Sequence, residues 1–273
     1  MTIGSIGDEQ IADEYFFALR SRSVLDCRYY PYKYRGKIQA FPVRRKNLEG
    51  GNGRNYRVNP ISDRPDPGDL EDFAVICQVK IEEVIGSTDI YLVDQIMKGR
   101  YTANDNVLDA GCGYGRNLHW FLRNDVVIYG VDQDVHAIHD LQRRYPAVAE
   151  RFRQSAVEKI PFENDRFDHI ISSAVLHFAK DTAHFRQMIA EMLRVLKPSG
   201  SLFIRMTSDI GIEDKVRLAG DGVYDIPDGS RRFLLTRTLL ADIMQNSGLS
   251  FVEPLKTVNV NDVRCMSTLV LRK

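Results

Sequence analysis

Apolar positions follow two rhythms along residues 105–273, and the changes between them outline the elements of an α/β fold. Short apolar runs predict strands at 107–110, 126–131, 152–157, 167–173 and 201–205. Apolar residues at helical spacing predict helices at 116–122 and 135–144, and a third that begins at Asp181 or Thr182 and ends before Pro198. Strands that alternate with helices form a parallel sheet with helices on both faces.

The end of the chain departs from this alternation. A helix is predicted at 236–247, and two further strands at 251–260 and 266–271 are separated by only a few residues. So short a link holds no crossover helix, so these strands form an antiparallel pair. The pattern therefore predicts a Rossmann-like, doubly wound α/β sheet of about seven strands, mostly parallel, with a C-terminal antiparallel hairpin.

Apart from a helical stripe at 9–19, which predicts a short amphipathic helix, residues 1–78 follow neither rhythm. We expect an irregular N-terminal extension ahead of one folded domain at 79–273. Early in that domain, a helix at 90–97 is predicted, capped by Ser87 or Thr88 and ending at Gly99. The extension is basic: residues 20–57 hold 11 Lys or Arg against two acids, a net charge of +9. Such an arm either binds nucleic acid or an acidic partner, or simply lies against its own acidic domain, and we favour the second interpretation.

Composition narrows the class of protein. The 273 residues are 44% hydrophobic and 27% charged, which is typical of a globular protein. No apolar run approaches the roughly 20 residues of a membrane-spanning helix, so we expect no membrane partner. Residues 1–10 are polar and acidic, unlike a secretory signal. The four cysteines are far apart, which predicts neither a metal site nor a disulfide framework and favours the cytoplasm.

The chemistry centres on residues 107–117, where an apolar run ends at Asp109 and three glycines follow at alternate positions, Gly111, Gly113 and Gly115. A strand, a glycine-rich turn and a helix commonly hold a nucleoside-like cofactor. Asp132 ends the next strand, where a carboxylate accepts hydrogen bonds from ribose hydroxyls. A dinucleotide needs its third glycine one position later, and Asp109 would repel pyrophosphate. Both facts favour a cationic cofactor without phosphates, namely the sulfonium of S-adenosylmethionine.

Several motifs in order resemble those of the class I S-adenosylmethionine-dependent methyltransferases, in particular small bacterial members. Residues 107–117 are similar to motif I of that family, Asp132 to its ribose-binding acid, 155–162 to the segment beside adenine, and 193–200 to the helix and turn before the fifth strand. One departure is Ala156, where many relatives have an acid. The resemblance implies a cofactor site made of Asp109, Gly111, Gly113, Gly115, Asn117, Asp132, Gln133, Val157, Glu158 and Ser173.

The acceptor side is less constrained. His177 follows the fourth strand at the edge where ligands of open α/β sheets bind, so it is either a general base or a residue that packs under the cofactor or caps Asp181. A long, turn-rich insertion follows the fifth strand, and insertions of this length commonly bind or cover ligands. From this strand and insertion we predict an acceptor pocket of Arg205, Asp209, Tyr224 and Arg232.

The resemblance implies an enzyme that moves the methyl group of S-adenosylmethionine to an acceptor by in-line displacement. The compact domain favours a small-molecule acceptor. Two alternatives stay open: methylation of RNA or protein through the basic residues 20–57, and a non-catalytic cofactor-binding partner protein on the same fold. The sequence leaves the oligomeric state undetermined.

Overall fold

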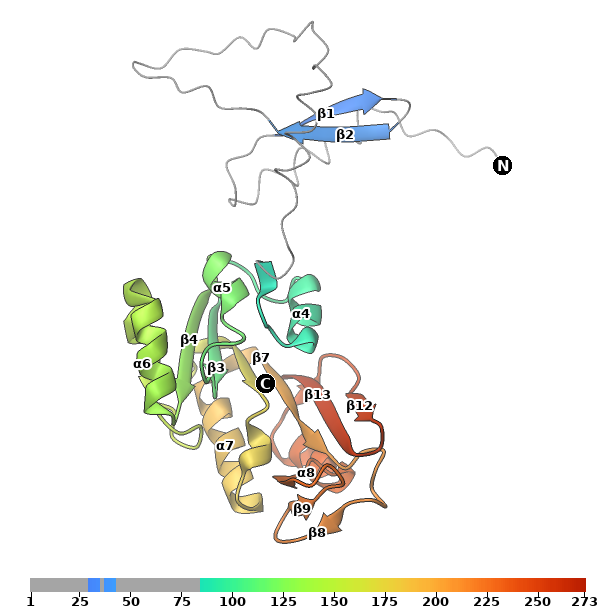
Figure 1. Cartoon of the computed structure of the whole chain (residues 1–273). Helices are drawn as coiled ribbons and strands as arrows, with labels where there is room; N and C mark the ends of the chain where they lie inside the picture. Colours follow the sequence, from blue (N-terminus) through green and yellow to red (C-terminus); the bar gives the residue numbers. More distant parts are fainter. Residues whose placement is uncertain (1–28, 35–36, 43–83) are drawn as a thin grey trace, which may run out of the picture. The chain divides into compact units, whose positions relative to one another are not determined.

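The computed structural model describes residues 29–34, 37–42 and 84–273, and it divides into two units between Asp72 and Phe73 (Figure 1). In the first unit, β1 (Tyr29–Tyr34) pairs antiparallel with β2 (Lys37–Pro42). The sequence pattern did not predict this hairpin, although its aromatic residues favour extended pairing. The rest of the extension, with most of the basic region 20–57 and the expected boundary at 78/79, lies outside the described residues.

The second unit contains the predicted, mostly parallel sheet. Five strands run parallel: β3 (Asn106–Ala110), β4 (Val127–Asp132), β5 (Phe152–Gln154), β6 (Phe167–Ser173) and β7 (Leu196–Ser208). Three antiparallel strands follow: β11 (Ser250–Phe251), β12 (Lys256–Val260) and β13 (Arg264–Arg272). The order is β11-β13-β7-β6-β3-β4-β5. Strand β7 pairs with one edge of β13, and both β11 and β12 pair with its other edge. The sheet therefore has the seven expected positions, and β12 and β13 form the expected hairpin.

Helices cover both faces of the sheet, as the alternation predicted (Figure 1). They are α4 (Ile90–Met97), α5 (His119–Arg123), α6 (Val135–Arg144), α7 (Thr182–Val195) and α8 (Arg237–Asn246), with short 3-10 helices η1 (Pro146–Arg151) and η2 (Leu176–Phe178). Buried side chains of α4, α5 and α6 pack against one face. Those of α7, with partly buried residues of α8, pack against the other.

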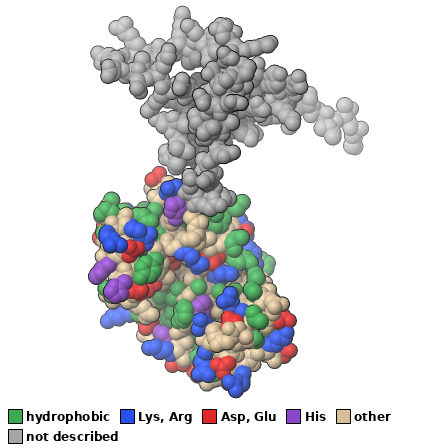
Figure 2. All heavy atoms as spheres, viewed as in Figure 1, with side chains coloured by type: hydrophobic (Ala, Val, Ile, Leu, Met, Phe, Trp, Pro, Cys, Tyr) green, Lys and Arg blue, Asp and Glu red, His purple; other side chains and the backbone are tan. Residues whose placement is uncertain are grey.

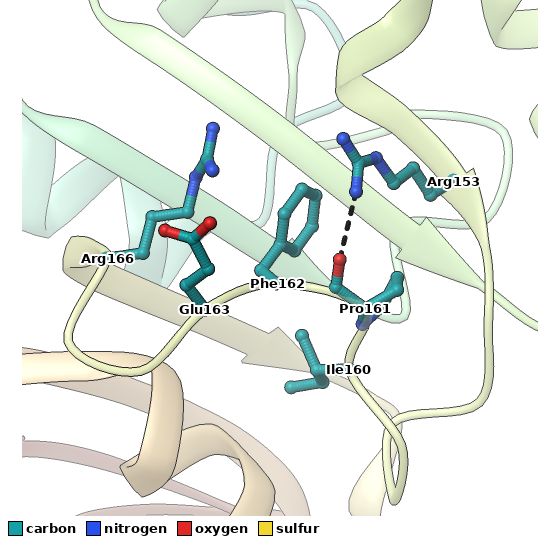
Figure 3. A pocket seen from close by; sticks show the side chains of 6 residues that line it. All are labelled: Arg153, Ile160, Pro161, Phe162, Glu163 and Arg166. Atoms are coloured by element: carbon teal, nitrogen blue, oxygen red, sulfur yellow. Dashed lines mark hydrogen bonds between the residues drawn. The ribbon is translucent and has the colours of Figure 1, made fainter.

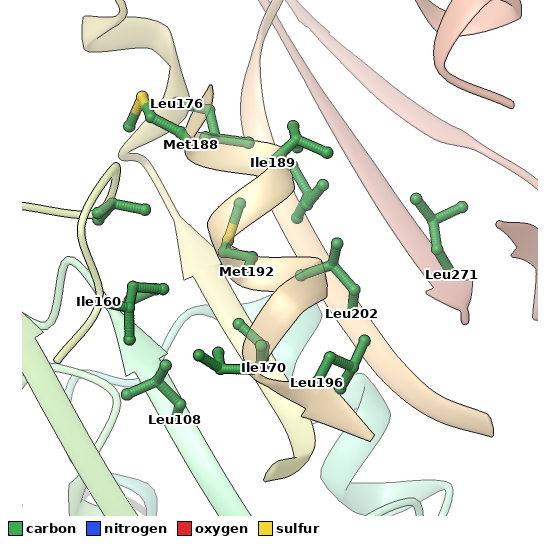
Figure 4. Close-up of a cluster of buried hydrophobic side chains, with 14 of the residues drawn as sticks. Leu108, Ile160, Ile170, Leu176, Met188, Ile189, Met192, Leu196, Leu202 and Leu271 are labelled. Carbon is green, nitrogen blue, oxygen red and sulfur yellow. The ribbon is translucent and has the colours of Figure 1, made fainter. Parts of the chain in front are cut away.

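The α7 face illustrates how burial holds these layers together (Figure 4). Met188 and Met192 of α7 belong to one buried cluster with Leu108 of β3 and Ile170 of β6. Met192, Leu108 and Ile170 are fully buried. Full burial of such a side chain contributes roughly 1.5–3 kcal/mol, so the stripe of apolar residues fixes where α7 lies. On the visible outer face of this unit, basic and acidic side chains are interspersed (Figure 2).

Several predicted elements differ in the structure, and the largest difference in bounds is that of β7, which spans 196–208 rather than 201–205. Helix α5 begins at His119 rather than residue 116, and β5 ends at Gln154 rather than residue 157. The strand predicted at 251–260 is divided into β11 and β12. The insertion after β7, expected to be turn-rich, contains a small antiparallel sheet of its own, β8 (Arg217–Leu218), β9 (Val223–Asp225) and β10 (Arg231–Phe233), in the order β10-β9-β8.

The strand order places the functional edge of the sheet. Strand β3 is central, and the chain leaves it toward β4 on one side and later returns to β6 on the other. Open α/β sheets bind ligands outside the carboxyl ends of their strands at such a switch point. The loop after β3 and the turn after β6 meet there.

Candidate functional site

The loop after β3 is held by its glycines in two different ways. Gly111, Gly113 and Gly115 have φ of +88°, +48° and +82°, a region that favours glycine. A Cβ on Gly111 would lie 2.3 Å from Val175 Cγ2, and one on Gly115 would lie 2.6 Å from Leu141 Cδ2. A Cβ on Gly113 would meet no atom within 4 Å. Gly111 and Gly115 therefore allow close packing, whereas Gly113 faces open space.

Asp132 fixes this loop from the end of β4. Its Oδ2 accepts a hydrogen bond from Gly113 N at 2.8 Å, and its Oδ1 accepts one from Asp134 N at 2.9 Å. The neighbouring Gln133 is exposed, and its carbonyl accepts a bond from the side chain of Gln154. Asp132 thus lies beside the open Gly113, with lone pairs left on both oxygens, as a ligand-binding carboxylate would.

Asp109 is the most unusual group of the site. It is fully buried at the end of β3, and neither carboxylate oxygen has a hydrogen-bond partner among the described residues. Burial raises the pKa of Asp109 to about 7. The field of Arg116 opposes this rise, the charge of Asp132 adds to it, and the nearby Asn117 side chain, which is not within hydrogen-bonding geometry, opposes it slightly. A buried, unpaired carboxylate is costly, and a cationic ligand would stabilise its charged form.

Asp89, which the sequence analysis missed, ties four elements together. It is the N-cap of α4, where its Oδ1 accepts from Tyr91 N, so the predicted caps Ser87 and Thr88 were wrong. Its Oδ2 accepts from Ser173 Oγ at 3.3 Å and from an Arg205 nitrogen at 3.0 Å, while its own N–H donates to Asn117 Oδ1. The side chain is 2% exposed. Three predicted residues therefore meet at Asp89: Ser173 and Arg205 at its buried carboxylate, and Asn117 at its backbone N–H.

The only local signal for Asp89 was its position: a short acidic residue just ahead of a helical stripe is a good N-cap. Its contacts to the ends of β6 and β7 are long-range, so no local pattern reports them.

The segment after β5 is held by contacts with α7. Val157 is 5% exposed, and Glu158 lies 3.3 Å from His184 Nε2. Arg194 donates to two carbonyls of this loop, those of Ile160 and Phe162, at 2.8 and 2.9 Å. Contacts with α7 therefore hold this loop in place beside the site, and the Glu158 carboxylate lies close to a histidine of α7.

His177 lies on η2, directly after β6, and is 8% exposed. Its Nδ1 is 3.2 Å from Thr207 Oγ1. Burial, followed by the fields of Arg232, Arg264 and Arg205, lowers the pKa of His177 to about 4. The ring is therefore neutral near pH 7, and its low pKa makes it a weak base.

The predicted acceptor residues form two groups, the arginines Arg205 and Arg232 and the pair Asp209 and Tyr224. Arg205 stacks on Tyr91 at 5.1 Å and pairs with Asp89, on the α4 side. Arg232 lies over the ring of Phe178 at 5.2 Å, next to His177. The second group is Asp209 with Tyr224. Burial raises the pKa of both, and the field of Asp209 adds to the shift of Tyr224.

A separate pocket of about 300 Å³ is found at the β5 end of the sheet (Figure 3). Arg153 and Arg166 flank the ring of Phe162, and Arg153 donates to Pro161 O at 2.9 Å. None of its lining residues is among the single residues predicted for the cofactor or the acceptor, but Ile160, Pro161 and Phe162 belong to the segment 155–162 that resembles the one beside adenine. Within the described residues, no group of three His, Cys, Asp or Glu side chains is arranged to hold a metal ion, and no helix is long and apolar enough to cross a membrane.

Comparison with known proteins agrees with this geometry. Residues 108–204 match the model of a family described as "Methyltransferase domain". A phthiotriol/phenolphthiotriol dimycocerosates methyltransferase of Mycobacterium leprae is 26% identical over 141 residues, 51% of this chain and 49% of that protein. A probable S-adenosylmethionine-dependent methyltransferase of Mycobacterium tuberculosis is 33% identical over 115 residues, 41% of this chain and 39% of that protein. The chain thus matches half or less of these relatives' lengths.

Among solved structures, a 1,6-didemethyltoxoflavin-N1-methyltransferase of Burkholderia thailandensis, with bound 1,6-didemethyltoxoflavin and S-adenosylhomocysteine, has a similar fold. The TM-score is 0.50 at 20% sequence identity, and the match covers 77% of this chain and 92% of that one. At this identity the likeness concerns the fold.

Proposed function

Since residues 108–204 form a methyltransferase domain of the class I S-adenosylmethionine-dependent superfamily, we propose that this protein transfers the methyl group of S-adenosylmethionine to a small organic molecule. The observation that carries the proposal is the pairing of an open glycine with two acids. Gly113 has free space where a Cβ would be, Asp132 lies beside it, and Asp109 is buried without a partner.

These residues fit the cofactor chemically. The glycine leaves room for a ligand against the backbone, Asp132 has acceptor lone pairs for ribose hydroxyls, and Asp109 supplies a negative charge that a cation would stabilise. When bound, S-adenosylmethionine supplies an electrophilic methyl group on a positively charged sulfur. The contribution of the chain is to hold the two reactants in line and to exclude water.

On the acceptor side, the proposal is supported by His177, which contacts Thr207 near the carboxyl end of β7, and by Arg205 and Arg232, whose charges act on His177. His177 is neutral near pH 7, so it is able to accept a hydrogen bond from the acceptor. Its low pKa argues for a positioning role over full proton abstraction. In the described residues, the thiols of Cys112 and Cys265 are free and buried, which supports placing the protein in a reducing compartment such as the cytoplasm.

The +9 charge of residues 20–57 favours a second candidate, methylation of RNA. RNA binding by the full chain would then weaken steeply between 50 and 200 mM salt, and the effect would vanish in a chain lacking residues 1–78. Salt-independent or absent binding would leave the small-molecule function alone in place.

Calorimetric titration with S-adenosylmethionine, S-adenosylhomocysteine and NAD tests the main proposal. We expect both sulfur compounds to bind and NAD not to. The matched variants are Gly113→Ala and Gly99→Ala, since both positions have positive φ and open space around a new Cβ. Each change is expected to lower the free energy of unfolding by about 1 kcal/mol, but only Gly113→Ala should weaken cofactor binding, by tenfold or more. Tight NAD binding, or equal cofactor affinity in both variants, would refute the proposal.

A further inference from the structure

The fields of three guanidinium groups, from three different strands, act on His177. Arg205 is two residues before Thr207 on β7, so both side chains point to the same face of the sheet, and Thr207 contacts His177. Arg232 comes from β10 and lies over the ring that follows His177 in the chain. Arg264 begins β13, and its field also reaches His177. The face of the sheet edge around His177 is therefore electropositive.

Two of these cations have only part of a counter-charge. Arg205 is 3.0 Å from an oxygen of Asp89, but that same oxygen also lies 3.8 Å from a second arginine, Arg116. The Arg264–Asp228 pair is long, at 3.8 Å, and the arginine side chain is half exposed. At that distance and exposure the Arg264–Asp228 pair neutralises little of the field of Arg264. Arg205 and Arg116, in turn, share the single charge of the buried Asp89.

The third cation, Arg232, forms no ion pair with an acid among the described residues, although its field reaches Asp228 and lowers the pKa of that carboxyl. Its Nη1 donates a hydrogen bond to the carbonyl of Arg231 at 2.8 Å. Asp209, a half-buried acid of the same insertion, has a pKa raised by burial and by the nearby Glu213.

The aromatic surface beside Arg232 gives the site a shape. Phe178 is 61% exposed, which is unusual for so large an apolar side chain. The Arg232 guanidinium lies 5.2 Å from the centre of its ring, and the His177 ring meets it edge-on at 4.5 Å. A flat apolar ring and a planar guanidinium with free N–H groups together suit a ligand that is planar and negatively charged.

We propose that the methyl acceptor is a small planar anion, an aromatic or conjugated molecule with a carboxylate, whose plane lies against Phe178 and whose charge pairs with Arg232. Arg232 then determines specificity, because a neutral analogue of the acceptor would leave the charge of Arg232 without a partner. This inference rests on the proposed function, since it assigns the substrate class of the same site.

Binding of paired probes tests it without requiring turnover. The full chain, saturated with S-adenosylhomocysteine, is titrated with benzoate, 2-naphthoate and indole-3-carboxylate and with the three corresponding neutral amides. At least one acid is expected to bind tenfold or more tightly than its amide. Arg232→Gln should reduce that ratio to threefold or less, whereas Arg217→Gln, an exposed β8 arginine paired with Asp225, should leave it unchanged.

Each outcome decides the question. If no acid binds more tightly than its amide, or if the preference survives in Arg232→Gln, the assignment of an anionic acceptor is wrong. If S-adenosylhomocysteine itself fails to bind, the proposed function fails instead. A ligand-free NMR titration of the His177 ring provides a second readout: its pKa should rise in Arg232→Gln, because a nearby cation has been removed, and an unchanged pKa would contradict the convergence of charge.

Discussion

Asp109→Asn is expected to stabilise the cofactor-free protein at pH 8. The folded-state pKa of Asp109 is about 7 against a usual 3.8, because burial disfavours the charged form. A difference of about three pKa units corresponds to a penalty of roughly 4 kcal/mol above pH 7. The Asn amide keeps the size and removes the charge, but an unpaired buried amide costs about 1–3 kcal/mol. We therefore expect a net gain of about 1–3 kcal/mol.

The sign of the pH dependence follows from the raised pKa. Between about pH 4 and 7 the folded state holds the Asp109 proton and the unfolded state does not, so stability falls as pH rises through this range and levels off above it. Urea unfolding at pH 5 and pH 8 measures this. The advantage of Asp109→Asn should be present at pH 8 and lost at pH 5. Asp134→Asn, at an exposed N-cap that asparagine also satisfies, is the control without such a dependence.

The same carboxyl links protons to cofactor binding. A cationic ligand favours ionised Asp109, so at pH 7 about half a proton should be released from it on binding S-adenosylmethionine. Calorimetry in two buffers of different ionisation heat counts these protons. The ligand's own amino group titrates alike in both proteins, so the proton release should be larger in the wild type than in Asp109→Asn. The variant should also bind S-adenosylmethionine at least tenfold more weakly at pH 8. Equal proton release, or a variant less stable at pH 8 than the wild type, would refute the reasoning.

Three further changes test how the site is held together. Asp89→Asn keeps the N-cap acceptor but leaves the charge of Arg205 unpaired, so urea unfolding should show that the free energy of unfolding falls by about 2–4 kcal/mol, against about 0.5 kcal/mol or less for Asp134→Asn. Equal losses in the two variants would argue against the Asp89 cluster. Gly222→Ala would place a Cβ 2.2 Å from Phe233 Cε2 at a φ of +72°, so its melting temperature should fall well below that of Gly229→Ala, which has positive φ but no neighbour within 4 Å. Matching melting temperatures would mean that the insertion rearranges without cost around the new Cβ. Arg194→Lys removes the planar guanidinium that donates to two loop carbonyls and to an acid of α7, so amide hydrogen exchange at 155–164 should become at least tenfold faster. Unchanged exchange would show that other contacts hold the loop.

Where local pattern and tertiary packing agree, the sequence was sufficient. Strand β6 has the predicted bounds of 167–173, and α7 begins after Asp181, whose side chain caps it by accepting from His184 N. The glycine loop was likewise located correctly, since alternating glycines after an apolar run leave few other conformations. Its role in cofactor binding remains a prediction at the level of single residues.

Boundaries moved where distant residues took over. Helix α5 begins at His119 because Gly115 holds φ +82° and Asn117 is drawn to Asp89 N, 28 residues away. The contact between Asn117 and Asp89 leaves no trace in hydrophobic periodicity, because it depends on a partner far along the chain. The break in the strand expected at 251–260 had a local signal instead: Pro254 lies between β11 and β12, and proline has no N–H to donate to a β ladder.

The sequence by itself determined the alternating elements, the doubly wound sheet with its antiparallel end, and the position of the cofactor loop, because these follow from periodicity and from backbone angles that glycine allows. Only the tertiary structure decided the electrostatics of the site. It buried Asp109 without a partner, joined Asp89 to Arg205 across 116 positions, and gathered three arginines around His177. Charge and burial at a point depend on everything that surrounds it, and only the folded chain fixes those surroundings.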